Sequence, residues 1–234
     1  DWSSDVCSSD LHSGDHAEID FFLRKFKQQA DALQRPGIVA AGVSLGGNAL
    51  MRWAGEHGLA AQQRVKAVAS ICSPLDLAAS GKAIGEGFNR QVYTRMFLRS
   101  MKPKALNKLK QHPGLFDAKR MLAAKDLYEF DNVFTAPLHG FQNTEDYWIR
   151  ASAKPHLASI QIPALAINAI NDPFIPPESL PKQGEVGAYV KLWQPVRGGH
   201  VGFAANCLTQ FPGHLQTLPR AVAAFFDSDR KSVV

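Results

Sequence analysis

The segment Gly42-Val43-Ser44-Leu45-Gly46 constrains the fold of this chain more than any other stretch of its sequence. It fits the pattern G-x-S-x-G, follows an apolar run at residues 38–41 and precedes apolar residues at helical spacing. The order strand, sharp turn, helix holds a serine in a strained backbone and lifts its Oγ clear of the sheet. Neighbouring glycines let the two backbones pass close together. The pattern predicts that Ser44 is a nucleophile; the alternative is a glycine-rich turn without chemistry.

A nucleophilic serine needs a base that takes its proton and a carboxylate that orients the base. Residues 162–167 and 189–193 predict two strands. Asp172 lies on the loop after the first strand, and His200 lies in a glycine-rich loop after the second. Ser, Asp, His is the chain order of such a triad, and open parallel sheets place their sites beyond the carboxyl ends of the strands. We therefore expect Ser44, Asp172 and His200 to form a catalytic triad.

Other residues compete for the acid and base positions. Asp76 follows a predicted strand at residues 65–72 and is the alternative acid. The rival bases lie mostly in proline- and glycine-containing turns or fit a structural role better: His112, His139, His156 and His214. Leu45 directly follows the nucleophile, so we expect its backbone N–H to donate one hydrogen bond to the oxyanion.

The composition is typical of one globular domain, with 234 residues of which 45% are hydrophobic and 20% charged. No apolar run reaches the roughly 18 residues that a membrane-spanning helix needs. Three cysteines without a framework spacing predict reduced thiols and a cytoplasmic location. No His/Cys cluster has metal-ligand spacing, and no glycine-rich loop fits a phosphate. We therefore expect neither a metal nor a cofactor.

The net charge of +5 is concentrated in one segment. Between residues 90 and 120, nine lysines and arginines accompany a single acidic residue, Asp117. A solvated helical face explains this pattern; the alternative is attraction to an anionic membrane surface or to acidic substrates. Aromatic residues are not interleaved with the charges as base stacking requires, so we do not expect nucleic acid as a partner.

The alternation of strands and helices stops between residues 75 and 155. This stretch predicts helices broken at Pro103 and at other prolines: 88–101, 103–111, 117–125 and 143–151. A helical insertion between core strands at this point is typical of a cap over an active site. The predicted organisation is a core at 12–74, a helical cap at 75–155 and a second core part at 156–228.

Several motifs resemble those of the YheT-like α/β-hydrolases, a branch that includes medium-chain ethyl ester synthases/esterases and lipid hydrolases. They are spread over nearly all of residues 12–228: His12-Ser13-Gly14, 42–48, 129–137, 139–141, 146–147, 151–152, 171–174 and 198–203. The resemblance implies an α/β-hydrolase fold and places the nucleophile, acid and base of the family on Ser44, Asp172 and His200. One departure is Asn171, where the family usually has a second aspartate; if that position supplied the acid, the triad would be broken.

The resemblance also bears on both ends of the chain. Residues 1–11 contain seven Ser or Asp, and nothing in them could pack on a core. We interpret residues 1–11 and 229–234 as tails foreign to the domain; the alternative is natural disorder. In the complete fold further strands precede the elbow, whereas here one predicted helix does. We therefore expect an incomplete, mostly parallel sheet whose first strands are missing, with an exposed edge that promotes aggregation.

The function expected from these residues is that of a serine hydrolase of carboxylic esters, acting through an acyl-enzyme without a cofactor. The resemblance implies acyl esters or lipids as substrates. The second oxyanion donor of the family belongs to the missing part, and loss of one such donor costs about 10²–10³ in rate. The alternatives are an acyltransferase or thioesterase of the same fold, and an inactive truncated fragment.

Overall fold

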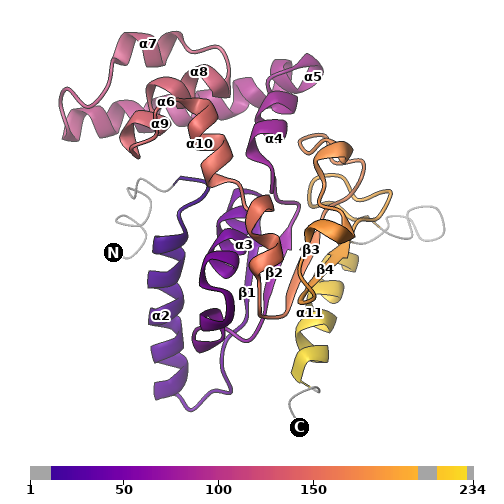
Figure 1. Ribbon diagram of the computed structural model, residues 1–234. Coiled ribbons are helices and arrows are strands. Elements are labelled where there is room, and N and C mark those ends of the chain that lie inside the picture. Colours follow the sequence, from indigo (N-terminus) through magenta and orange to yellow (C-terminus); the bar gives the residue numbers. More distant parts are fainter. Residues whose placement is uncertain (1–11, 205–214, 231–234) are drawn as a thin grey trace. The chain divides into compact units, whose positions relative to one another are not determined.

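The computed structural model describes residues 12–204 and 215–230 (Figure 1). The chain divides into two compact units. Of the described residues, the core unit holds 13–76, 152–204 and 215–230, and the helical unit holds Leu77–Ala151 together with His12. The predicted foreign tails at 1–11 and 231–234 lie outside the described residues, while residues 229 and 230 are the last two of helix α11 (Thr217–Arg230).

The described strands of the core unit form one parallel sheet. They occur in the order β1-β2-β3-β4, with the bounds Ala40–Val43, Val68–Ile71, Ala164–Ile167 and Val190–Trp193. Ala40 pairs with Val68, Val68 with Ala164, and Ala164 with Val190. Every residue of β2 and β3 is buried, as expected for central parallel strands covered on both faces. The α/β fold predicted from the sequence is confirmed.

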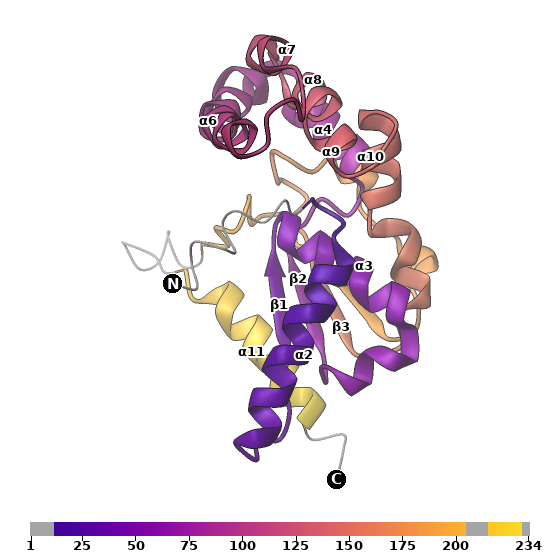
Figure 2. The ribbon, with the colours of Figure 1, turned by 90° about the vertical axis from the view of Figure 1, so that its left-hand side faces the viewer.

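Side-chain alternation along the strands divides the core into two clusters, one on each face of the sheet. Even-numbered residues such as Val68 and Ala164 pack in a cluster that includes Trp53 of α3 (Leu45–His57) and Leu23 of α2 (His16–Ala32). Odd-numbered residues such as Ile71 pack with α11 instead. Figure 2 shows the result, with α2 and α3 on one side of the strands and α11 on the other.

Polar contacts join distant segments within the core unit. Asn48 of α3 is fully buried; its Nδ2 donates to the carbonyl of Ser13 at 2.7 Å, and its Oδ1 accepts from the N–H of Ala153 at 2.9 Å. The remaining short elements of this unit are 3₁₀ turns: η1 (Gly58–Gln63), η3 (Lys154–Ser159), η4 (Pro177–Ser179) and η5 (Gln183–Glu185). The buried amide thus joins the start of the first segment of the core unit to the start of its second segment.

Strand β1 lies at an edge of the described sheet. Its residues alternate between half-buried and exposed, and Val43 is 47% exposed. A hollow of about 790 Å³ lies beside this edge, lined by residues of α2 and of 35–41. The apolar edge expected from the sequence is therefore present in the described part of the chain.

The helical unit consists of helices and one π-helical turn. Its elements are α4 (Leu77–Ile84), α5 (Gly87–Asn89), η2 (Arg90–Thr94), α6 (Arg95–Gln111), α7 (Ala118–Ala123), α8 (Leu127–Val133), α9 (Thr135–Leu138) and α10 (Thr144–Ala151). The predicted break at Pro103 is wrong, because α6 continues through it. A proline removes one helical hydrogen bond, but its fixed φ of about −65° suits a helix. No described helix is long and apolar enough to cross a membrane.

The helical unit has its own apolar clusters. Trp148 packs with α4 and α9, and Phe130 packs with α6 and α7. Between them lies Asp131, whose carboxylate accepts from the Thr135 hydroxyl at 2.6 Å and from Trp148 Nε1 at 2.9 Å. Burial raises the pKa of Asp131 to about 6, although both hydrogen bonds favour the charged form.

Candidate active site

Ser44 occupies a strained turn between β1 and α3. Its φ is 53° and its ψ is −127°, and a positive φ is disfavoured for any residue other than glycine. Strain of this kind costs on the order of 1–3 kcal/mol and persists only where the surrounding structure imposes it. Here the Ser44 N–H donates to the carbonyl of Ile71 at 2.9 Å, which extends the β1–β2 pairing into the turn. The serine therefore stands just beyond the carboxyl end of its strand.

Glycines make this turn possible because strand and helix nearly touch. A Cβ on Gly42 would lie 2.5 Å from the carbonyl oxygen of Gly46. A Cβ on Gly47 would collide with Ser73 Oγ and lie 2.6 Å from the carbonyl oxygen of Gly42. By contrast, no atom lies within 4 Å of a Cβ placed on Gly46. Of the three glycines around Ser44, Gly42 and Gly47 are thus required for packing and Gly46 is not.

Asp172 and His200 form a close pair on the loops after β3 and β4. His200 Nδ1 lies 2.8 Å from Asp172 Oδ2, and the Asp172 side chain is fully buried. The other carboxylate oxygen, Oδ1, accepts from the N–H of Phe174 at 2.9 Å. With Nδ1 donating to the carboxylate, a neutral His200 carries its lone pair on Nε2, where it can accept a proton.

Asn171 positions the loop that carries the histidine. Its Oδ1 accepts from the N–H groups of Gly198 and Gly199, both at 2.9 Å. The carboxylate that faces His200 belongs to Asp172, so the asparagine at position 171 removes no carboxylate from this pair. Its side chain holds the backbone just before the imidazole instead.

Cys72 links the histidine loop to the strand next to β1. Its Sγ accepts from the N–H of Val201 at 3.3 Å and lies 3.9 Å from the carbonyl oxygen of Gly199. Burial raises the pKa of the Cys72 thiol to about 11, so the thiol stays protonated and is not a nucleophile at neutral pH. Because Ile71 also binds the Ser44 backbone, the end of β2 joins the loop of His200 to the elbow. Nothing in the sequence predicts this role for Cys72.

The residue expected to donate to the oxyanion, Leu45, lies at the start of α3. Leu45 is the first residue of this helix and is 51% exposed. The first N–H groups of a helix have no partner within the helix, and the helix dipole adds partial positive charge there. The Leu45 amide is thus placed where it can donate to negative charge next to Ser44.

The rival histidines occupy other surroundings. His139 packs against His12 within the helical unit, with ring centroids 4.9 Å apart. His156 lies 3.8 Å from a carboxylate oxygen of Glu56, and burial lowers its pKa. His112 follows the last residue of α6, and His214 lies outside the described residues. The alternative acid, Asp76, is the last residue before the helical unit.

No candidate metal site is found over residues 12–204 and 215–230, where no group of three His, Cys, Asp or Glu side chains comes together.

Comparison with known proteins identifies the family. A family model described as the alpha/beta hydrolase fold matches residues 5–204. The putative esterase YheT of Escherichia coli is 32% identical over 84% of this chain and 57% of its own length. Human phospholipase ABHD3 is 30% identical over 71% of this chain and 40% of its own length. The monoacylglycerol lipase of Saccharomyces cerevisiae is 27% identical over 69% of this chain and 37% of its own length.

The chain thus spans about half the length of these curated relatives or less. The match covers the turn at Ser44 and the loops that carry Asp172 and His200. Together with the parallel sheet and the strained serine turn, it shows that the chain belongs to the alpha/beta hydrolase fold family.

Proposed function

We propose that this chain carries the catalytic triad of a serine hydrolase that cleaves carboxylic esters, with Ser44 as nucleophile, His200 as base and Asp172 as the acid of the triad. The observation that carries the proposal is the 2.8 Å contact between His200 Nδ1 and the fully buried carboxylate of Asp172. A buried carboxylate on Nδ1 holds the imidazole in the tautomer that accepts a proton at Nε2.

Two further features support the role of Ser44. Its backbone is strained at a sharp strand-to-helix turn, which is the geometry that exposes the nucleophile in this kind of site. The loop that carries His200 is bound to Cys72, next to the residue that binds the Ser44 backbone. The turn at Ser44 and the loop of His200 are therefore both held at the carboxyl ends of the strands of one sheet.

The proposed reaction has two halves. Ser44 Oγ attacks the ester carbonyl while His200 Nε2 accepts the hydroxyl proton, and the Leu45 N–H donates to the oxyanion. Collapse of the tetrahedral intermediate breaks the ester C–O bond, and His200 returns the proton to the departing alcohol. Water then attacks the acyl-enzyme, with His200 again as base. The bond between the acyl carbon and Ser44 Oγ breaks, His200 returns the proton to Oγ, and the acid leaves. Asp172 orients the imidazole and stabilises the imidazolium that forms.

The relatives suggest the class of ester. Two of them are named a phospholipase and a monoacylglycerol lipase, so we propose esters of acyl chains as substrates. A third relative, from Saccharomyces cerevisiae, is named medium-chain fatty acid ethyl ester synthase/esterase 2 and is 26% identical over 86% of this chain. An alcohol in place of water in the second half of the reaction would give that outcome, an ester instead of an acid.

Covalent labelling tests the proposal most directly, because a fluorophosphonate reacts with a serine only when a base activates it. Intact mass is measured after incubation of the full chain, Ser44→Ala and Ser100→Ala, whose serine is exposed on α6. The expected result is one adduct on the chain and on Ser100→Ala, and none on Ser44→Ala. An adduct that persists in Ser44→Ala would contradict the assignment, as would the absence of any adduct on a folded chain.

A series of p-nitrophenyl esters then tests the substrate class. Hydrolysis that rises from acetate to octanoate and disappears in Ser44→Ala supports acyl esters, since an apolar pocket favours longer chains. A rate that falls steadily with chain length argues against them, while leaving the triad assignment intact.

A further inference from the structure

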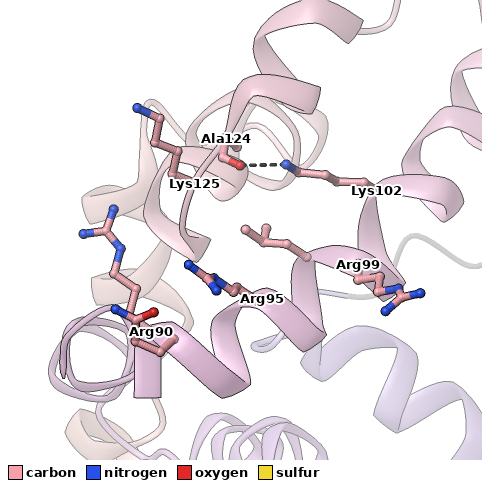
Figure 3. A pocket seen from close by; sticks show the side chains of 8 residues that line it. Arg90, Arg95, Arg99, Lys102, Ala124 and Lys125 are labelled. Atoms are coloured by element: carbon pink, nitrogen blue, oxygen red, sulfur yellow. Dashed lines mark hydrogen bonds between the residues drawn. The ribbon is translucent and has the colours of Figure 1, made fainter. Parts of the chain in front are cut away.

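The helical unit contains a pocket of about 580 Å³ whose lining is strongly cationic. Five basic side chains line it together with Leu98: Arg90, Arg95, Arg99, Lys102 and Lys125. All of them belong to Leu77–Ala151, so this basic pocket is built within one unit. Figure 3 shows its charged side chains, which come from η2, from α6 and from the connection between α7 and α8.

Helical geometry gathers the arginines. Arg95, Arg99 and Lys102 stand at positions i, i+4 and i+7 of α6 and so share one face of the helix. Arg90 begins the π-helical turn η2 that leads directly into α6. Hydrogen bonds in such a turn reach one residue further than in an α-helix, and π-turns are frequent at functional sites. The π-helical turn thus brings Arg90 to the same pocket as Arg95, Arg99 and Lys102.

The position of the Lys102 side chain is explained by hydrogen bonds within the helical unit, whereas those of Arg95 and Arg99 are not. Its Nζ donates to the carbonyl oxygens of Leu122 and Ala124, both at 2.7 Å, and these carbonyls lie at the end of α7, where helical partners are missing. Figure 3 shows the contact with Ala124. These hydrogen bonds hold the ammonium group of Lys102 in place at the pocket, beside Ala124.

The charges of Arg95 and Arg99 are not compensated within the part of the chain that the structure describes: neither guanidinium has an ion-pair or hydrogen-bond partner there. Two carboxylates lie near the pocket. That of Asp126 is 4.0 Å from Arg90 and also accepts from the N–H of Glu129 as the cap of α8. That of Glu129 accepts from the N–H of Lys125 at 2.7 Å. Like charges one helical turn apart destabilise a helix. An anion in the pocket would remove this repulsion.

We propose that the basic pocket binds a phosphate group. The planar guanidinium of arginine matches phosphate with two parallel hydrogen bonds, and lysine adds a point charge. A phosphate monoester offers three terminal oxygens and nearly two negative charges, so it can engage several of these side chains at once. A carboxylate, with two oxygens and one charge, would leave most of them unpaired. The phosphate is either part of a soluble molecule or the headgroup of a lipid.

Calorimetric titration of the full chain with sn-glycerol 3-phosphate at low ionic strength tests the soluble form. Acetate serves as the comparison anion. The pocket variant is Arg95→Gln/Arg99→Gln, and the matched control is Lys104→Gln/Lys110→Gln, which removes the same charge from exposed positions of the same helix outside the pocket. One site per chain is expected. Binding should be weakened about a hundredfold in the pocket variant, since each of the two lost guanidiniums contributes about tenfold through a hydrogen bond to a charged group, and it should be unchanged in the control.

Sedimentation with phosphatidylcholine vesicles, with and without phosphatidic acid, tests the lipid form. Binding that needs phosphatidic acid and is lost only in the pocket variant identifies a lipid headgroup if glycerol 3-phosphate does not bind. Binding of both identifies a general site for phosphate monoesters. Far-UV circular dichroism checks that each variant folds. If the pocket variant does not, Arg99→Lys, which keeps the charge but loses the planar fork, is expected to weaken binding about threefold.

Three results would overturn the proposal. Equal weakening in the pocket variant and the control would show diffuse attraction to a basic surface. Acetate binding as tightly as the phosphate would show a site without preference for phosphate. Binding in neither assay by a folded chain would show no site. None of these results bears on fluorophosphonate labelling of Ser44, so this proposal and that of the triad fail separately.

Discussion

Replacing Gly47 by alanine probes the close approach of α3 to the strand ends that shape the elbow. The added Cβ would collide with Ser73 Oγ and lie 2.6 Å from the carbonyl oxygen of Gly42 and 2.8 Å from Ser70 Oγ. A serine side chain can rotate away, but the carbonyl belongs to β1 and cannot. To accommodate the added Cβ, α3 must move away from the sheet, or β1 must bend.

The expected magnitude follows from two opposing effects. Alanine in place of glycine within a helix stabilises it by about 1 kcal/mol. Overpacking a tight contact costs about 1–3 kcal/mol, and the contacts at Gly47 call for the upper end of this range because one involves backbone. The net loss in free energy of unfolding is about 2 kcal/mol. Gly46→Ala is the matched control, since nothing lies within 4 Å of its added Cβ, and it is expected to be neutral or stabilising by up to about 1 kcal/mol.

Urea unfolding followed by far-UV circular dichroism measures both variants. The free energies of unfolding of the two variants should differ by about 2–3 kcal/mol, with Gly47→Ala the less stable. If Gly47→Ala unfolds at the same urea concentration as Gly46→Ala, or at a higher one, the tight contact described for the elbow is wrong.

Three further changes test other parts of the structure. Asp172→Asn keeps the shape of the side chain but favours the wrong imidazole tautomer, so kcat/KM for an activated ester should fall about 10⁴-fold; a rate near that of the unaltered chain would exclude Asp172 as the acid. Burial raises the pKa of Asp131 to about 6 from 3.8, so the folded state holds its proton more tightly than the unfolded state. The stabilising effect is complete below about pH 4 and is lost as the pH rises to about 6, amounting to about 3 kcal/mol. The difference in urea midpoint between the unaltered chain and Asp131→Asn should therefore change between pH 4 and pH 7, and a constant difference would contradict the raised pKa of the buried carboxyl. Asn48→Ala should cost about 2–4 kcal/mol in urea unfolding, because it leaves the buried N–H of Ala153 without its partner; a loss below about 0.5 kcal/mol would show that the amide does not join these segments.

The core could be predicted from sequence because its signals are local. Apolar runs predict β2 and β3, and the glycines at fixed positions around Ser44 predict the strand-to-helix turn from the sequence alone. The strand at residues 65–72 was predicted too long, since pairing with β1 and β3 limits β2 to Val68–Ile71. Strand ends are set by neighbours, which periodicity does not reveal.

The supports of the candidate site could not be predicted, because they join residues far apart in the chain. Cys72 binds the N–H of a residue 129 positions later, and a lone cysteine carries no signal for such a contact. The helical unit was harder still, because its short helices α8 and α9 are too brief for a clear helical period. Helix α6 passes through Pro103 because its other turns and Leu98 pack against neighbouring helices.

Asn171 and Asp172 are adjacent and nearly identical in shape, yet their side chains have different hydrogen-bonding roles. Position 171 supplies one oxygen to two backbone N–H groups, which an aspartate would serve equally well. Position 172 supplies a carboxylate to His200, where an amide would present the wrong proton. Exchanging the two residues leaves the composition and net charge of the protein unaltered, but moves the negative charge by one residue. Substitution tables treat Asn and Asp as similar residues. Here they are interchangeable at position 171 but not at position 172.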